Sequence, residues 1–369
     1  MKSVDSRLGA LPSQMLLELI DTGNIVGTES ARVRPSSIDL TLSDEVYRVE
    51  GIFQPRPGEP IREVLKQVKH DRYSWGQPLV CGQMYLARLN EKLSLPVDVY
   101  GYCNPKSTSG RLDLHVRLLA DGVPRYDSLT PAGWGGEMWV SIVPKTFSLI
   151  LHAGLSLNQI RLFNADTRLD ENKIQEAVSK YQLLWRLDDQ VPLSYEELKI
   201  RDNDGSLILT LDLKHQPLGY RAKLDVETAL DLKQLAHYEA QDFFEPIKLD
   251  GPLLTLRRGE FYILSTREAV RVPPELACEM VPMDEKSGEF RSHYAGFIDP
   301  GWGWGQTGEG KGRPLTLEVR PFEDIIVRHG QPIAKIKFEV MAELPALVYD
   351  SLDSNYVKQI GPRLAKHFK

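Results

Sequence analysis

An internal repeat constrains this 369-residue chain more than any other feature. Residues 79–111 align with residues 254–291 in the order of their apolar runs and turn residues. Gly259 and Pro273 follow Gly82 and Pro96 by the same 177 residues (259 minus 82, and 273 minus 96). Other landmarks keep the order at offsets of 168 to 180 residues: Lys106-Ser107 with Lys286-Ser287, Arg111 with Arg291, Trp134 with Trp302, and Gly154 with Gly330. Loop insertions produce such drifts, so we infer that one domain occurs twice, too few times for a solenoid.

Short apolar runs broken by proline and glycine fill both copies and predict β-strands. They occupy residues 37–49, 83–89, 138–143 and 147–163, and then residues 206–213, 253–266, 315–321 and 324–340. Residues 11–25 and 171–187 have helical spacing instead. The sequence predicts a mainly β protein: a first β domain at residues 1–168 (the first copy), a helical connector at 169–203, and a second β domain with a C-terminal tail at 204–369 (the second copy).

Composition and charge exclude several classes of function. The net charge of −6 gives no basic surplus for a nucleic-acid backbone, so we expect no polymeric nucleic acid as a partner. No apolar run approaches the roughly 20 residues that cross a bilayer, and the first residues do not form a signal peptide. The three cysteines form no CxxC pair. We expect a cytoplasmic protein without membrane contact and without a cysteine-based zinc site.

The stretch GFIDPGWGWGQTGEGKG, residues 296–312, concentrates turn-forming residues around Asp299 and Trp302. On these residues alone, a turn ending in a buried aromatic is the simpler interpretation. The first copy keeps Trp134 but has Pro131 in place of the aspartate. A Walker A loop is excluded because no serine or threonine follows Lys311. A zinc deaminase is also excluded, because no HxE with PCxxC occurs.

Two further motifs divide unequally between the copies. In LTLEV, Glu318 faces away from Leu317, and such strand glutamates are mostly exposed. The first copy has Ser141 at this point. Residues 106–111, KSTSGR, combine two cations with three hydroxyls, which suits a triphosphate, although a polar surface loop is the simpler interpretation.

Taken together, these stretches resemble dCTP deaminases of the trimeric dUTPase-like superfamily. Residues 296–319 resemble the family's IDPGW…LEF hairpin and strand, and KSTSGR resembles its RSSLAR phosphate motif. SIDLTLSDEVYRV at residues 37–49 resembles TVDVRLGNKF, and NYVKQIG at residues 355–361 resembles YRNQQG. Phe297 stands where the family usually has an arginine. The likeness covers nearly the whole chain and implies two tandem dUTPase-like distorted β-barrels, with active sites between neighbouring barrels.

The resemblance implies hydrolytic deamination of dCTP to dUTP and ammonia. Glu318 would be the general base, because one carboxylate with a raised pKa can deprotonate water and then protonate the leaving amine. Ser107 and Arg111 would be the other catalytic residues. The implied substrate-binding residues are Lys106, Thr108, Ser287, Arg291, Asp299, Trp302, Tyr356, Lys358 and Gln359. No cofactor or metal is implied for the chemistry, and Mg²⁺ would accompany the triphosphate only.

The first copy has the better phosphate motif, and the second copy has the better hairpin and base. We therefore predict one composite site across the copies. A reciprocal site of Ser287, Arg291, Trp134 and Ser141 would be catalytically dead. A dUTP diphosphatase, a bifunctional deaminase and diphosphatase, and a non-catalytic nucleotide-binding scaffold stay open as alternatives.

Assembly and the tail give two further expectations. A ring of three barrels needs a multiple of three, and each chain carries two, so we expect a homotrimer. The basic tail at residues 351–369 is either a frayed terminus or a lid over bound triphosphate.

Overall fold

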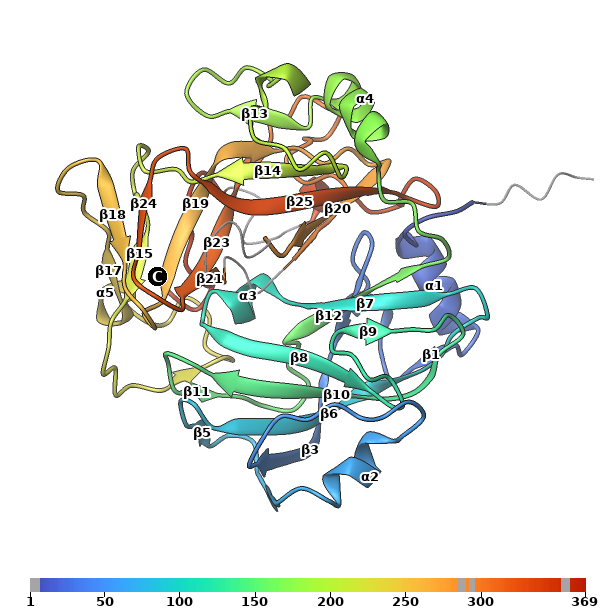
Figure 1. Ribbon diagram of the computed structural model, residues 1–369. Coiled ribbons are helices and arrows are strands. Elements are labelled where there is room, and N and C mark those ends of the chain that lie inside the picture. The colour runs from blue at the N-terminus through green and yellow to red at the C-terminus, as the bar shows by residue number, and fades with distance from the viewer. Residues whose placement is uncertain (1–6, 284–289, 292–295, 353–358) are drawn as a thin grey trace, which may run out of the picture.

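The computed structural model describes residues 7–283, 290–291, 296–352 and 359–369 (Figure 1). The α-helices are short: α1 (Ser13–Asp21), α2 (Ile61–Leu65), α3 (Ser107–Gly110), α4 (Glu171–Tyr181) and α5 (Ala240–Phe243). The strands up to residue 163 are β1 (Ile25–Val26), β2 (Ile38–Leu40), β3 (Leu42–Val49), β4 (His70–Arg72), β5 (Pro78–Leu79), β6 (Met84–Ser94), β7 (Tyr100–Pro105), β8 (Leu114–Ala120), β9 (Ser128–Leu129), β10 (Gly135–Pro144), β11 (Leu149–Ile150) and β12 (Asn158–Phe163).

The later strands repeat this pattern. They are β13 (Leu184–Arg186), β14 (Ser206–Thr210), β15 (Tyr220–Ala222), β16 (Leu230–Asp231), β17 (Phe244–Pro246), β18 (Leu253–Leu256), β19 (Tyr262–Val270), β20 (Leu276–Val281), β21 (Phe290–Arg291), β22 (Phe297–Ile298), β23 (Arg313–Pro321), β24 (Ile325–Arg328) and β25 (Pro332–Val340). The prediction of a mainly β protein is confirmed.

Two pairs of equivalent sheets show that the fold occurs twice. The order β4-β3-β6-β10-β8 in the first copy matches β17-β15-β19-β23-β21 in the second, and β2-β12-β7-β9 matches β14-β25-β20-β22. The register also repeats, since Ser141 pairs with Leu86 and Glu318 with Ile263, both shifted by 177 residues. Each copy has its own main hydrophobic core, and the copies lie side by side (Figure 1).

The expected helix at residues 171–187 is shorter than predicted. Asp170 caps its start by accepting from the Lys173 N–H at 3.0 Å. The helix ends at Tyr181 because Gln182 adopts a left-handed conformation with φ of 52°. Shortly after it, β13 pairs with β19, so the middle of the connector belongs to a sheet of the second copy.

Part of the second copy packs on the first. β16 pairs in parallel with β11, and Phe243 and Phe244 lie in the core cluster of the first copy. Ala365 and Phe368 near the C-terminus join the same cluster. Residues 359–369 are therefore anchored in a core and do not form a frayed terminus. The division of the chain at residues 168 and 203 stays a prediction.

No helix within the described parts of the chain is long and apolar enough to cross a membrane.

Candidate active site

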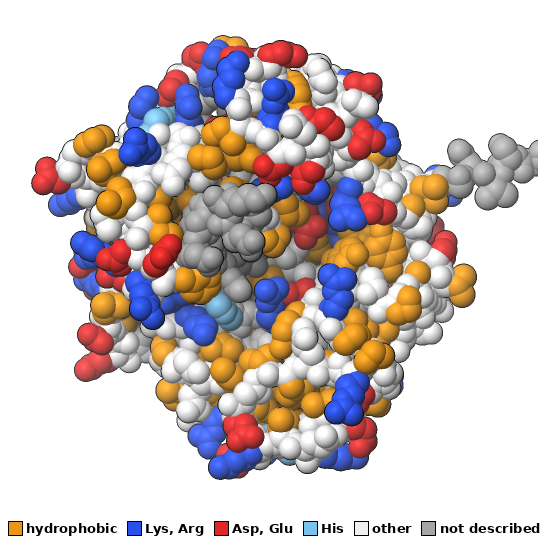
Figure 2. All heavy atoms as spheres, viewed as in Figure 1, with side chains coloured by type: hydrophobic (Ala, Val, Ile, Leu, Met, Phe, Trp, Pro, Cys, Tyr) orange, Lys and Arg blue, Asp and Glu red, His pale blue; other side chains and the backbone are white. Residues whose placement is uncertain are grey.

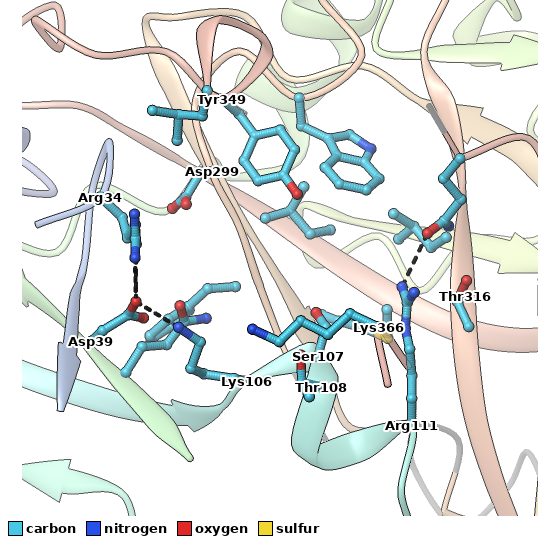
Figure 3. Close-up of a pocket in the computed structure, with 18 of the residues that line it drawn as sticks. Arg34, Asp39, Lys106, Ser107, Thr108, Arg111, Asp299, Thr316, Tyr349 and Lys366 are labelled. Atoms are coloured by element: carbon cyan, nitrogen blue, oxygen red, sulfur yellow. Dashed lines mark hydrogen bonds and ion pairs between the residues drawn. The ribbon is translucent and has the colours of Figure 1, made fainter. Parts of the chain in front are cut away.

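A cavity of about 290 Å³ lies where the two copies meet (Figure 3). Figure 2 shows Lys, Arg, Asp and Glu side chains around a hollow near the centre of one face of the molecule. The lining residues come from both copies and from the C-terminal segment: Arg34, Asp39, Lys106, Ser107, Thr108, Arg111, Gln159, Met280, Phe297, Ile298, Asp299, Trp302, Leu315, Thr316, Glu318, Tyr349, Leu352, Gln359 and Lys366.

The phosphate motif forms the wall that the first copy contributes. Lys106 ends the segment after β7, and Ser107 and Thr108 begin α3. The Lys106 Nζ lies 2.5 Å from Asp39 Oδ2, and the Arg34 guanidinium donates to the same oxygen at 2.8 and 2.9 Å. Burial lowers the pKa of Lys106, and the Asp39 carboxylate opposes this shift. Two cations share one buried acid, so this end of the cavity favours an anionic ligand.

Glu318 on β23 faces Arg111, the residue that follows α3. The Arg111 Nε and a Glu318 carboxylate oxygen are 3.8 Å apart, and each side chain is at most 4% exposed. The interpretation of Glu318 as a solvent-facing strand residue is therefore wrong, because the first copy covers that face of β23. Thr316, two positions before Glu318, lines the same cavity, as strand alternation requires.

Gln359 fixes the other side of Arg111. Its side-chain oxygen accepts from Arg111 Nη2 at 3.0 Å, and its Nε2 donates to the Pro314 carbonyl at 2.8 Å. Gln359 is 4% exposed. The tail thus reaches the site and contacts Arg111, and the predicted contact of Gln359 with the nucleotide stays a prediction.

The hairpin after β22 forms the facing wall. Asp299 Oδ1 accepts from Ser36 Oγ at 2.9 Å and from Arg161 Nη2 at 3.2 Å. Trp302 is buried and packs against Tyr349, with ring centroids 4.9 Å apart. The sequence analysis described Trp302 as a buried aromatic at the end of a turn and, by resemblance, as a substrate-binding residue. In the structure the side chain is buried and also lines the cavity.

Gly301 lets the hairpin approach the segment that carries Tyr349. Its φ is +88°, and a Cβ at this position would meet the Val348 Cβ at 2.7 Å and the Tyr349 nitrogen at 2.8 Å. The Tyr349 N–H donates to the Pro300 carbonyl at 2.8 Å. Glycine is needed here for both conformation and space.

The structure brings most of the predicted site residues together. Eight line this cavity: Lys106, Ser107, Thr108, Arg111, Asp299, Trp302, Glu318 and Gln359. Ser287, Tyr356 and Lys358 lie outside the described residues, as does the side chain of Arg291. Trp134 and Ser141 of the expected reciprocal site do not line this cavity.

Sequence reasoning missed several residues of the site. Asp39, Arg34, Tyr349 and Lys366 line the cavity without having been predicted. Arg161 was also missed, although it holds Asp299 and lies 4.3 Å over the Phe297 ring. Asp39 in SIDLTL and Arg161 in NQIRLF are charges inside apolar strands, and this is the signal that could have found them.

Within the described residues, no group of three or more His, Cys, Asp or Glu side chains could hold a metal ion. The polar groups that face the cavity are instead a buried carboxylate with a guanidinium beside it, and a cluster of cations further along. Within a duplicated β fold, this set of groups suits the class of proteins that bind a small anionic molecule and carry out proton transfer on it.

Comparisons with known proteins agree with that class. The family described as 2′-deoxycytidine 5′-triphosphate deaminase (DCD) N-terminal domain matches residues 7–166, and its C-terminal domain matches residues 180–368. The crystal structure of 2′-deoxycytidine 5′-triphosphate deaminase from Agrobacterium tumefaciens is similar, with 34% sequence identity and a TM-score of 0.82. The similarity covers 92% of this chain and 97% of that chain. A comparison with curated protein sequences finds no match. The chain belongs to the dCTP deaminase family.

Proposed function

We propose that this chain hydrolyses dCTP to dUTP and ammonia in the cavity between its two copies. The observation that carries the proposal is Glu318, a carboxylate buried 3.8 Å from Arg111 on the wall of a cavity with cations further along. Family membership indicates the class of substrate, and the lining residues provide groups that suit each part of the nucleotide.

The proposed reaction needs one base and one proton donor, and Glu318 can serve as both in turn. The carboxylate takes a proton from a water molecule, whose oxygen attacks C4 of the cytosine ring. The same proton passes to the amino group, which leaves as ammonia, and the proton of the new C4 hydroxyl moves to N3 to give the uracil ring. Arg111, held by Gln359, orients the Glu318 carboxylate. Ser107 is the remaining residue proposed to be catalytic.

The walls of the cavity suggest how the nucleotide is oriented. Lys106, Ser107 and Thr108 offer a cation and two hydroxyls for the triphosphate, as charge-assisted contacts to phosphate require. Asp299 on the facing wall is placed to accept from a hydroxyl of the sugar, and Trp302 packs beside it. We expect Mg²⁺ to arrive with the triphosphate as part of the substrate.

Product analysis separates deamination from its alternatives. Incubation with dCTP and Mg²⁺ should release one ammonia per dUTP and no diphosphate. Release of diphosphate from dUTP would favour the diphosphatase or bifunctional alternative, and binding of dCTP without any turnover would favour the scaffold. The family models and the similar crystal structure name deaminases, and they do not favour these alternatives.

We also propose that the protein is cytoplasmic and forms a homotrimer. The cavity itself has walls from both copies of one chain, so the neighbouring barrels that it needs are already present. The trimer therefore rests on the argument that barrels of this family form rings of three. Sedimentation equilibrium should give three times the chain mass, and a stable monomer would contradict the trimer.

A further inference from the structure

Arg161 is a buried arginine that links the two copies behind the hairpin. It lies on β12 of the first copy and its side chain has no exposed surface. The acceptors of its guanidinium all belong to the second copy: the Cys278 carbonyl at 3.0 Å, Glu339 Oε1 at 3.0 Å, the Ile298 carbonyl at 3.4 Å and Asp299 Oδ1 at 3.2 Å. A buried guanidinium is costly unless it is paired, so this arrangement of acceptors fixes its position closely.

Asp299 is held by the first copy through a single carboxylate oxygen. Both Arg161 Nη2 and Ser36 Oγ donate to Oδ1. In the parts of the chain that the structure describes, no other group donates to the Asp299 side chain. The side chain lines the cavity and is 11% exposed. The first copy thus fixes Oδ1, and Oδ2 is left to accept from a ligand.

The same guanidinium also fixes the backbone that carries Asp299. Arg161 donates to the carbonyl of Ile298, the residue before Asp299, and packs over the ring of Phe297. Removing the guanidinium would free both the side chain and the start of the hairpin. A shift of about 1 Å in a group that positions a substrate can cost about a hundredfold in rate.

We propose that Arg161 is a positioning residue that orients Asp299 toward the sugar of the bound nucleotide and so sets the preference for a free 3′-hydroxyl. The inference rests on the proposed function, because it takes a deoxynucleoside triphosphate as the ligand. A deoxynucleoside triphosphate has one free hydroxyl, at the 3′ position. Arg161 itself does not touch the nucleotide, and it acts through Asp299.

The test compares dCTP with 2′,3′-dideoxycytidine triphosphate, which lacks that hydroxyl. In the full-length wild type, calorimetry should show tighter binding of dCTP. In Arg161→Gln, we expect the Kd of dCTP to rise about tenfold while the Kd of the dideoxy nucleotide changes less than about twofold. Asp299→Asn should give the same pattern, and combining the two substitutions should add little, because both remove one interaction.

Two further variants keep the test decisive. Arg271→Gln is the matched control, because Arg271 is also buried and also donates to backbone carbonyls, those of Tyr181 and Gly308, but does not line the cavity. It should leave unchanged the Kd of the dideoxy nucleotide divided by the Kd of dCTP, the ratio that measures the preference for the 3′-hydroxyl. If Arg161→Gln does not fold, Ser36→Ala removes the other donor to Oδ1 and should lower the same ratio about threefold.

The outcomes distinguish this inference from the proposed function. Equal weakening of both nucleotides in Arg161→Gln, or no weakening, would overturn the positioning role. A wild type that prefers dCTP over the dideoxy nucleotide but releases no ammonia would overturn deamination and leave the positioning role intact. A wild type that binds neither nucleotide would overturn both.

Discussion

Trp134 in the first copy and Trp302 in the second end equivalent turns, and their surroundings differ. The Trp134 Nε1 donates to the Asp121 carbonyl at 2.9 Å. The buried Trp302 Nε1 has no hydrogen-bond partner among the described residues, and the ring lines the cavity. Buried donors are rarely left without a partner, so the second turn has the features of a binding site and the first those of a structural turn.

The equivalent strands β10 and β23 differ in the same sense. Ser141 on β10 donates weakly to the Arg117 carbonyl at 3.4 Å and is buried within the first copy. Glu318 occupies the same register position on β23 and faces Arg111 of the other copy. A buried carboxylate is retained only where a partner compensates its charge, and here the partner comes across the junction. The copies thus differ at the cavity, where the first contributes Lys106 and Arg111 and the second contributes the Glu318 carboxylate.

The largest expected effect on turnover distinguishes Glu318 on β23 from Ser141 on β10. Glu318→Gln should lower kcat for dCTP by about 10²- to 10⁴-fold, the usual contribution of a general acid–base residue, while binding stays measurable. Ser141→Ala, at the equivalent position, should keep wild-type turnover. Ammonia release and calorimetry on both variants check this. Equal turnover in the two variants would remove Glu318 from the mechanism.

A second comparison concerns two phenylalanines. Phe368 packs against Phe243 and Phe244 in the core of the first copy, with ring centroids 5.4 and 5.5 Å apart. Phe368→Ala should cost about 3 kcal/mol in the free energy of unfolding, since it empties a core position. Phe322→Ala, at a position 57% exposed in the second copy, should cost about 0.5 kcal/mol or less. Urea unfolding measures both, and similar midpoints would mean that the tail is not anchored.

His367 makes the attachment of this tail sensitive to acid. Burial lowers the pKa of His367 to about 4, below the ordinary value of 6.5, and Lys366 adds to this shift. The Leu232 carbonyl and Asp231 oppose it. The folded protein keeps the imidazole neutral, so its contribution to stability is complete above pH 6.5 and is lost as the pH falls toward 4. Between pH 7.5 and pH 5 the loss should be about 2 kcal/mol.

Urea unfolding at the two pH values checks this slope. His367→Gln should be less sensitive to pH over that range by the same amount. His237→Gln, which changes an exposed histidine on the segment that pairs with the tail, is the control and should keep the wild-type slope. An unchanged slope in His367→Gln would assign the acid sensitivity to other groups.

The smallest expected effect distinguishes two roles for Gln359. If it holds Arg111, Gln359→Ala should lower kcat about tenfold, the value of one hydrogen bond to a charged group, with little change in the Kd of dCTP. If it binds the nucleotide, as the sequence suggested, the Kd should rise instead. Gln234→Ala, at an exposed position, should change neither quantity.

Local sequence was enough to predict the repeat, the strands and the motifs. Alternation of apolar residues, turn residues and helix caps act over a few neighbours, so they can be read from one copy at a time. The KSTSGR motif and the Asp299–Trp302 turn were recognised in this way. The unequal distribution of the motifs between the copies was also visible, because Pro131 and Ser141 stand where the second copy has Asp299 and Glu318.

The tertiary structure decided which charges are buried and what they contact. An exposed Glu318 was the simpler interpretation of the sequence, because strand alternation says which face a residue takes and nothing about what covers that face. Arg161 escaped notice because its partners, Glu339 and Asp299, lie 178 and 138 residues away in the chain. Gln359 was assigned to the ligand by resemblance alone, and no local pattern indicated that its side chain also contacts Arg111. Contacts between residues so far apart in the chain depend on how the two copies pack, and no short stretch of sequence encodes that packing.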